Sequence, residues 1–278
     1  MKLQGGLGNQ LFQYAAGRSI SLANRQRLLL DVSSYRNDYL GRKCLLQHFN
    51  IAGKIVDRTW LQKLITPRTR VNRLFTGLSL VEEHTEKDFT YKGEWLTTHR
   101  PFTFYDGFWQ SYKYFEEFRE SLLLELTLKD HSPEALAKRL PQQGPCVAIH
   151  VRRTDYLEDD RYGFLGEEYY STALRFLGER LENPCFMVFS DDIDWCRQHL
   201  QTGEQTHYIS SASGLADYEE LYLMSLCSHQ VIANSSFSWW GAWLNRHPDK
   251  MVLRPARPFR DPALLYESYY PADWISVE

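Results

Sequence analysis

The chain has 278 residues, 43% of them hydrophobic, and its 32 basic and 35 acidic side chains leave a formal net charge of -3. This length holds one large domain or two smaller ones, and either can bury a substantial core. The near-neutral charge argues against bulk electrostatic binding to nucleic acid, although it is compatible with a local basic pocket.

The first predicted element is a βαβ unit. A very short apolar piece leads into a glycine-rich loop over residues 5–10, followed by a helix over 11–24 and a buried strand over 28–30. Asp31 lies about 20 residues beyond the glycines, as in dinucleotide-binding units, but Leu11 stands where the third glycine of GxGxxG belongs. An NAD-dependent dehydrogenase is therefore disfavoured. The glycines instead indicate that a ligand approaches the backbone closely.

The next segment, over residues 58–73, is basic and helix-like, and Pro67 is expected to break it. A solvated face is the default interpretation, and contact with a membrane surface or an anionic carrier is the alternative. An aromatic stretch around Tyr105 precedes a helix ending near Leu126. A short helix and the sequence Pro-Gln-Gln-Gly-Pro then mark the best domain boundary, which predicts domains 1–143 and 144–278.

Three apolar runs follow the boundary, and each ends in a polar cluster. The runs cover 147–149, 186–189 and 231–233, with helices predicted near 167–180 and 217–228. Continuous apolar runs are typical of buried parallel strands, and open α/β sheets bind ligands at the carboxyl ends of their strands. The three clusters are therefore expected to meet at one edge.

The first cluster places Arg152 and Arg153 directly after a strand. Successive side chains point to opposite faces, so one arginine can aim at a ligand while the other pairs with a carboxylate such as Asp155. Arginine matches phosphate oxygens through two parallel hydrogen bonds. The alternative is a surface loop with a weak local ion pair.

The third cluster, over residues 234–238, brings hydroxyl and amide groups to the start of a predicted helix. Helix N-termini attract anions, and ordinary N-capping by Ser235 or Ser236 is compatible with that role. The tryptophans that follow are expected to pack in the core rather than to form a sugar platform: Trp239, Trp240 and Trp243.

The second cluster contains Asp191 and Asp192. Asp192-Ile193-Asp194 matches the DxD metal site of another glycosyltransferase architecture, but only two carboxylates are in sight, so a hydrogen bond to a base or ribose is the favoured interpretation. The five cysteines have no zinc-type spacing, so we expect no metal and a reduced compartment. No HExxH, GxSxG or GxxxxGK[ST] pattern occurs, which disfavours the commonest protease, hydrolase and P-loop functions.

Three blocks of sequence carry a family resemblance. H-V-R-R-T-D at 150–155 resembles the HxRRxD motif of α1,2-, α1,6- and protein O-fucosyltransferases. G-G-L-G-N-Q-L-F-Q-Y-A and L-M-S-L-C-S-H-Q-V-I-A-N-S-S-F-S-W-W-G-A-W-L resemble the α1,2-fucosyltransferases of glycosyltransferase family eleven. F-S-D-D also fits. The last long block favours this family over the α1,6- and protein O-enzymes. Residues from about 32 to 104 match nothing recognisable.

The resemblance implies a GT-B type α/β fold, with two Rossmann-like domains facing across a cleft. The first domain is expected on the acceptor side and the second to bind GDP-fucose. The implied reaction is inverting, metal-independent transfer of L-fucose from GDP-fucose to the 2-hydroxyl of a terminal β-galactose. A non-catalytic sugar- or nucleotide-binding module is the alternative from another class.

Carried over by position, the resemblance assigns catalytic roles to Arg153, His150 and Asp155, with Asp155 more an orienting group for an arginine than a base. The implied donor-binding residues are Gly6, Asn9, Arg152, Arg153, Asp191, Asp192, Asn234, Ser235, Ser236 and Phe237. No apolar signal segment follows Met1 and no stretch reaches the ~18 apolar residues that span a bilayer. We therefore expect a bacterial cytoplasmic enzyme without a transmembrane segment, or the soluble part of an anchored protein.

Overall fold

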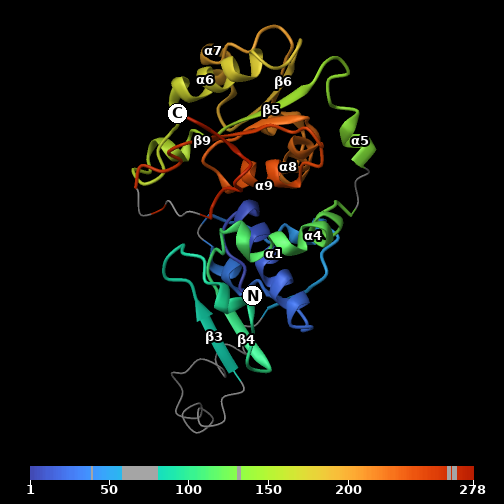
Figure 1. Ribbon diagram of the computed structural model, residues 1–278, viewed down its shortest axis with the longest axis vertical. Helices are drawn as coiled ribbons and strands as arrows, with labels where there is room; N and C mark the ends of the chain where they lie inside the picture. Colours follow the sequence, from blue (N-terminus) through green and yellow to red (C-terminus); the bar gives the residue numbers. More distant parts are fainter. Residues whose placement is uncertain (39, 58–80, 130–132, 262–263, 265–267) are drawn as a thin grey trace. The chain divides into compact units, whose positions relative to one another are not determined.

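The computed structural model describes residues 1–38, 40–57, 81–129, 133–261, 264 and 268–278 (Figure 1). They form two compact units, each considered by itself. The first runs from Met1 to Thr127 and includes Ser268 and Tyr269, and the second holds the rest from Leu128. The basic stretch predicted over 58–73 lies outside the described residues.

The first unit is built around parallel strand pairs. β1 (Leu29–Asp31) pairs with β2 (Lys54–Val56), and β3 (Val81–Thr85) pairs with β4 (Phe102–Asp106). The first residues of the chain link the pairs, because the backbone N–H of Lys2 donates to the Tyr105 carbonyl at 3.0 Å, and Lys2 forms a parallel bridge with Asp31. The βαβ prediction is thus confirmed, with a first strand reduced to a bridge.

Helix α1 (Leu7–Ala23) begins four residues before the predicted start at Leu11. The glycine loop ends at Gly6, whose carbonyl accepts the first helical hydrogen bond from Gln10. Asn9 therefore lies in the first turn of α1 and not in a loop. The earlier start buries Leu7 as well as Leu11 in the core. The described residues of this unit also form α4 (Arg119–Glu125) and the 3-10 turns Ser33–Asn37, Leu46–His48, Gly93–Leu96, Tyr112–Tyr114 and Glu116–Phe118.

The second unit contains a six-stranded parallel sheet in the order β10-β9-β8-β5-β6-β7. The strands are β5 (Cys146–Val151), β6 (Cys185–Ser190), β7 (Thr206–Ile209), β8 (His229–Val231), β9 (Val252–Pro255) and β10 (Ile275–Val277). The helices are α5 (Pro133–Ala137), α6 (Gly166–Gly178), α7 (Ile193–His199), α8 (Asp217–Leu226) and α9 (Ser236–Leu244), with 3-10 turns at Asp155–Leu157 and Ser211–Ser213. The three predicted strands are present and occupy the centre of the sheet, but β8 ends at Val231, where the predicted run 231–233 begins.

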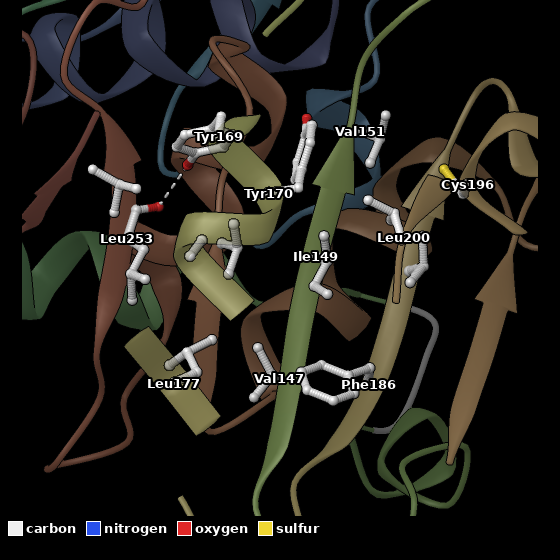
Figure 2. Close-up of a cluster of buried hydrophobic side chains, with 14 residues drawn as sticks. Val147, Ile149, Val151, Tyr169, Tyr170, Leu177, Phe186, Cys196, Leu200 and Leu253 are labelled. Carbon is white, nitrogen blue, oxygen red and sulfur yellow. Dashed lines mark hydrogen bonds between the residues drawn. The ribbon is translucent and has the colours of Figure 1, made fainter. Parts of the chain in front are cut away.

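Side chains of β5 alternate between two hydrophobic clusters. Val147, Ile149 and Val151 face one cluster, which Figure 2 shows packed against Tyr170 and Leu177 of α6. The intervening positions face the other cluster, where Cys146 and Ala148 lie with Met187, Leu223, Met224 and Cys227. This alternation sends the residues after Val151 to opposite faces of the sheet.

The division between the units falls after Thr127, whereas the predicted boundary was at 143/144. The segment that precedes the Pro-Gln-Gln-Gly-Pro turn packs on the second unit. Leu140 contacts the cluster on the α8 side of the sheet, and α5 contacts α8. A turn rich in proline and glycine therefore marks the start of β5 and not the boundary.

Candidate functional site

The polar residues predicted at the strand ends meet at the carboxyl edge of the second sheet. β5 and β6 pair in parallel through Val151 and Ser190, so Arg152 and Arg153 follow one strand where Asp191 and Asp192 follow its neighbour. β8 pairs with β5 on the other side and leads into α9. The predicted coincidence of three strand ends is confirmed.

Arg153 is held by an acidic and an aromatic group together. Its Nη1 donates to Asp192 Oδ2 at 2.6 Å, and its guanidinium lies 5.5 Å from the ring centres of both Phe164 and Trp195. The buried Nε has no hydrogen-bond partner within the described part of the chain. Charge pairing and cation–π contact together restrict the guanidinium to one orientation.

Arg152 points to different partners. Its Nη2 donates to Asp155 Oδ2 at 2.7 Å, and its Nε lies 3.5 Å from Asp191 Oδ2. The guanidinium also lies 5.9 Å from the ring centre of Tyr156. The two adjacent arginines therefore have separate environments, as the strand alternation predicted. Asp155 touches Arg152, which is the contact that an orienting role requires.

The two aspartates after β6 organise the turn after β5. Asp191 accepts hydrogen bonds from the backbone N–H groups of Arg153 and Thr154, at 3.0 and 3.2 Å, and from the Thr154 hydroxyl. Asp192 accepts from Arg153 through one oxygen and caps α7 through the other, which accepts from the Trp195 N–H at 3.0 Å. Both carboxylates thus have protein donors, and their contacts fix the double-arginine turn.

His150 is buried on the face of the sheet covered by α8 and α9, with its ring centre 5.6 Å from that of Phe237. Burial, and then the positive charge of Arg152, lower the pKa of His150 to about 3. The imidazole is therefore neutral at physiological pH. It can serve there as a hydrogen-bonding and packing group.

The N-terminus of α9 lies at the same edge. Ser235 caps the helix by accepting a hydrogen bond from the Phe237 N–H at 3.3 Å, which confirms the predicted N-capping. The Asn234 amide is buried and donates to the carbonyls of Gly163 and Pro258, at 3.0 and 2.6 Å. Asn234 therefore anchors the neighbouring loops beside the helix start, while Ser235 and Ser236 form the helix entrance. The tryptophans of α9 are buried in the core, as expected: Trp239, Trp240 and Trp243.

Gly6 and Asn9 belong to the first unit. Gly6 is the extended N-cap residue of α1, without a side-chain cap, and no acidic residue lies in the first turn. The first backbone N–H groups of this 17-residue helix therefore have no carboxylate of the helix's first turn competing for them. Asn9 Oδ1 accepts a hydrogen bond from Gln110 Nε2 at 2.7 Å.

Several contacts at the second unit's edge were not predicted. Phe164 and Trp195 flank Arg153. Both lie too far from Arg153 along the chain for a sequence pattern to indicate the contact. Tyr156 donates from its hydroxyl to the Asn234 carbonyl at 3.3 Å. Glu220, in α8, has a pKa raised to about 7 by burial and then by the charge of Asp217. The three acidic residues in the first turn of α8, Asp217, Glu219 and Glu220, are the sequence feature that could have suggested Glu220.

Within the described ranges, every helix is too short or too polar to cross a bilayer. The family model for glycosyl transferase family 11 matches residues 1–278. An alpha-1,2-colitosyltransferase from Escherichia coli is 32% identical over 287 residues, which cover 100% of this chain and 98% of that protein. A galactoside alpha-(1,2)-fucosyltransferase 1 from Alouatta belzebul is 29% identical over 165 residues, covering 54% of this chain and 45% of that protein.

Among solved structures, the NodZ alpha-1,6-fucosyltransferase soaked with GDP-fucose matches with a TM-score of 0.55 and 15% identity, covering 87% of this chain and 90% of that one. This likeness concerns the fold, and it agrees with the predicted GT-B type of α/β architecture. The family match over the full chain and the 32% identity over its whole length establish the chemistry class. The chain is a glycosyltransferase and belongs to glycosyl transferase family 11.

Proposed function

We propose that this enzyme transfers L-fucose from GDP-L-fucose to the 2-hydroxyl of a terminal β-galactose. The observation that carries the proposal is the joint placement of Arg152, Arg153 and the N-terminus of α9 at one sheet edge. Arginine forks and helix N-termini are two established protein devices for binding phosphate groups. The relatives named for alpha-1,2 transfer support the linkage.

Charge at the leaving group explains why fixed cations are needed. The acceptor oxygen forms a bond to the anomeric carbon as the bond from that carbon to the phosphate oxygen breaks. The electron pair of the broken bond leaves with GDP, and the acceptor proton passes to solvent or to a carboxylate. Attack opposite the leaving group inverts the anomeric carbon. Preorganised donors at the diphosphate then stabilise the charge as it develops.

In this scheme Arg153 contacts the diphosphate, and the neutral His150 contributes a buried hydrogen-bonding group beside it. Asp155 orients Arg152, which is supported by their 2.7 Å hydrogen bond. Ser235, Ser236 and Phe237 present the helix entrance to the same phosphates. Asp191 and Asp192 hold the double-arginine turn in place, and Asn9 and Gly6 of the first unit contact the donor near its sugar or phosphate.

A second donor is favoured by one observation, because the relative that matches the whole chain is named for colitose. Colitose is the 3-deoxy counterpart of L-fucose, so GDP-colitose presents the same diphosphate to the same arginines. The two sugars differ only in one hydroxyl. A comparison of the two donors on one acceptor therefore separates the candidates.

The proposal is tested with purified protein, GDP-fucose or GDP-colitose, and a panel of terminal β-galactosides. Release of GDP is followed with each acceptor, and the product linkage and anomeric configuration are assigned by NMR. We expect acceptor-dependent release with an α1,2-linked product. A matched galactoside that lacks only its 2-hydroxyl serves as the control and should be inert.

An α1,6-linked product would replace the proposal by the α1,6-fucosyltransferase alternative. Binding of GDP-fucose without acceptor-dependent turnover, across the whole panel, would support a non-catalytic binding module instead. Efficient turnover of GDP-colitose alone would shift the donor assignment and keep the linkage.

A further inference from the structure

A partly buried carboxylate anchors a turn in the first unit. Glu86 directly follows β3, and its Oε2 accepts hydrogen bonds from the backbone N–H groups of Phe108 and Trp109, at 2.7 and 3.0 Å. Gly107 lies so close that a Cβ there would be 2.5 Å from the Glu86 Cβ. The turn over residues 107–111, which follows β4, is therefore fixed against Glu86. We call it the 107–111 turn.

The 107–111 turn holds an unfavourable backbone conformation. Trp109 has a φ of +59°, in the left-handed region that bulky residues rarely adopt, and its side chain is completely buried. Such strain persists only where the surroundings enforce it, and it is concentrated at functional sites. Here Glu86 Oε2 accepts both N–H groups, and Gln13 of α1 donates to the Gly107 carbonyl at 3.1 Å.

The turn leads directly to Asn9. Gln110 follows the strained residue, and its Nε2 donates to Asn9 Oδ1 at 2.7 Å. Because Gln110 occupies the oxygen, the Asn9 amide is oriented with its Nδ2 as the remaining donor. Nδ2 lies over Gly5, where an added Cβ would be 2.6 Å from it, so the missing side chain of Gly5 leaves room for this orientation.

We propose that Gln110 is a positioning residue, which turns the amide nitrogen of Asn9 toward the anionic donor and which the Glu86-anchored 107–111 turn holds in place. The inference rests on the proposed function, because it takes Asn9 to contact the nucleotide sugar. An amide oxygen facing a phosphate is repelled, whereas an amide N–H donates to it. The orientation of one amide thus decides whether Asn9 helps or hinders binding.

A double-mutant cycle tests the relay in the full chain. Gln110→Ala should lower kcat/KM for GDP-fucose by about tenfold to a hundredfold, the effect of losing one hydrogen bond to a charged group. In the Asn9→Ala background the same change should have almost no further effect, because Gln110 acts only through Asn9. Independent, additive losses would overturn the inference.

Two further variants separate positioning from folding. Gln110→Glu keeps the size of the side chain but accepts hydrogen bonds only, so it should reverse the Asn9 amide and raise the KM for donor more than Gln110→Ala does. Ser111→Ala is the matched control in the same turn, since it removes only the 2.7 Å hydrogen bond to Ser268, and it should retain wild-type kinetics. A Gln110→Glu enzyme with a wild-type KM would refute the proposed orientation.

Calorimetric titration with GDP-fucose runs the same cycle without turnover. If the wild-type protein neither binds nor transfers fucose, the proposed function and this inference fall together. If the wild type is active and the cycle is additive in both measurements, the proposed function stands and the role of Gln110 alone is rejected.

Discussion

At the scale of single residues, Arg153 depends on shape as much as on charge. Asp192 and the rings of Phe164 and Trp195 hold its planar guanidinium. A lysine in its place retains the charge but provides no fork for two parallel hydrogen bonds and stacks less well on the rings. We expect Arg153→Lys to lower kcat by about 10²–10³, in the range for loss of one preorganised donor.

Arg161 offers the matched arginine control. Arg161 is exposed and pairs with Asp159, in the loop after the 3-10 turn Asp155–Leu157. Arg161→Lys therefore makes the same chemical change away from the double-arginine turn. Steady-state turnover of both variants, after circular dichroism has verified folding, gives the comparison. Equal and near-wild-type rates for the two variants would rule out the proposed role of Arg153.

Glu220 makes stability depend on pH in a direction that can be worked out. Its pKa rises from 4.5 to about 7 in the folded chain, because burial and the charge of Asp217 disfavour ionisation. Between these values Glu220 loses its proton in the unfolded chain but keeps it in the folded chain. Its contribution to the free energy of unfolding is therefore fully present below pH 4.5 and is lost as pH rises through 7. The melting temperature of Glu220→Gln should therefore fall less than that of the wild type between pH 5 and pH 8.

Asp217→Asn provides a graded control for that measurement. It removes the neighbouring negative charge but leaves the burial of Glu220, so the pKa of Glu220 should move down toward its ordinary value. The fall in melting temperature should then begin at the same pH, which the unfolded chain sets, but it should end at a lower pH and be smaller. Wild-type and Glu220→Gln curves that run parallel from pH 5 to pH 8 would contradict the assigned pKa.

The sequence predicted the polar half of the site but not its aromatic half. Arg152, Arg153, Asp191 and Ser235 follow strands, so the rule for carboxyl ends of parallel strands places them together. Phe164 and Trp195 reach Arg153 only through packing of α6 and α7 on the sheet. No spacing in the chain encodes that contact, and such nonlocal packing is where reasoning from the sequence stops.

At the scale of elements, a buried charge network joins α1 to α4. Arg18 donates to Glu125 through Nε and Nη2, at 2.9 and 2.6 Å, and the Tyr14 hydroxyl also donates to Glu125. Tyr14 in turn accepts from the Ala52 N–H at 2.9 Å. Removal of Glu125 leaves Arg18 partly buried without its counter-charge. Glu125→Ala should therefore destabilise the chain by about 3–5 kcal/mol, measured by urea unfolding.

The pair Arg180–Glu179 is the surface counterpart, with side chains 45% and 65% exposed. Glu179→Ala should cost less than about 1 kcal/mol, because exposed ion pairs contribute little. The double variant Arg18→Met with Glu125→Leu should recover most of the loss, since no unpaired charge remains. Equal costs for Glu125→Ala and Glu179→Ala would show that the buried network is not what joins the helices.

Element prediction succeeded where the apolar pattern was strong. β5 and β6 lie at or beside the sheet centre and read as continuous apolar runs, and β8 ends at Val231, where the predicted apolar run 231–233 begins. β7, β9 and β10 alternate or contain Arg254 and Pro255, and they were not predicted. Edge and near-edge strands are covered on fewer sides, so their sequences need less apolar character. The early start of α1 was not predicted, because the glycines around its first turn are typical of a loop.

At the scale of the whole molecule, the residues that we propose to bind the donor come from both α/β units. Gly6 and Asn9 belong to the first unit, and the double-arginine turn and the start of α9 belong to the second. The sequence indicated two domains, but the division lies after Thr127 and not at 143/144. The reason is that Leu140, which precedes the proline- and glycine-rich turn, packs on the hydrophobic cluster of the second unit. In the first unit α1 begins at Leu7 after the glycine loop, and in the second unit α9 begins at Ser236 after β8.

This organisation leads to a prediction about metal ions. In the second unit Asp191 and Asp192 accept hydrogen bonds from Arg153, Thr154 and Trp195, so their carboxylates already have protein donors. In the proposed mechanism, arginines and a helix N-terminus stabilise the charge that develops on GDP. We expect fucosyl transfer to retain its rate in EDTA and to change less than about twofold on addition of Mn²⁺ or Mg²⁺.

The rate should instead fall as salt is raised, because screening weakens the attraction between the arginines and the diphosphate. Initial rates of GDP release across an EDTA, metal and NaCl series make the measurement. Activity that disappears in EDTA and returns with Mn²⁺ would mean that a cation, and not the double-arginine turn, stabilises the departing nucleotide.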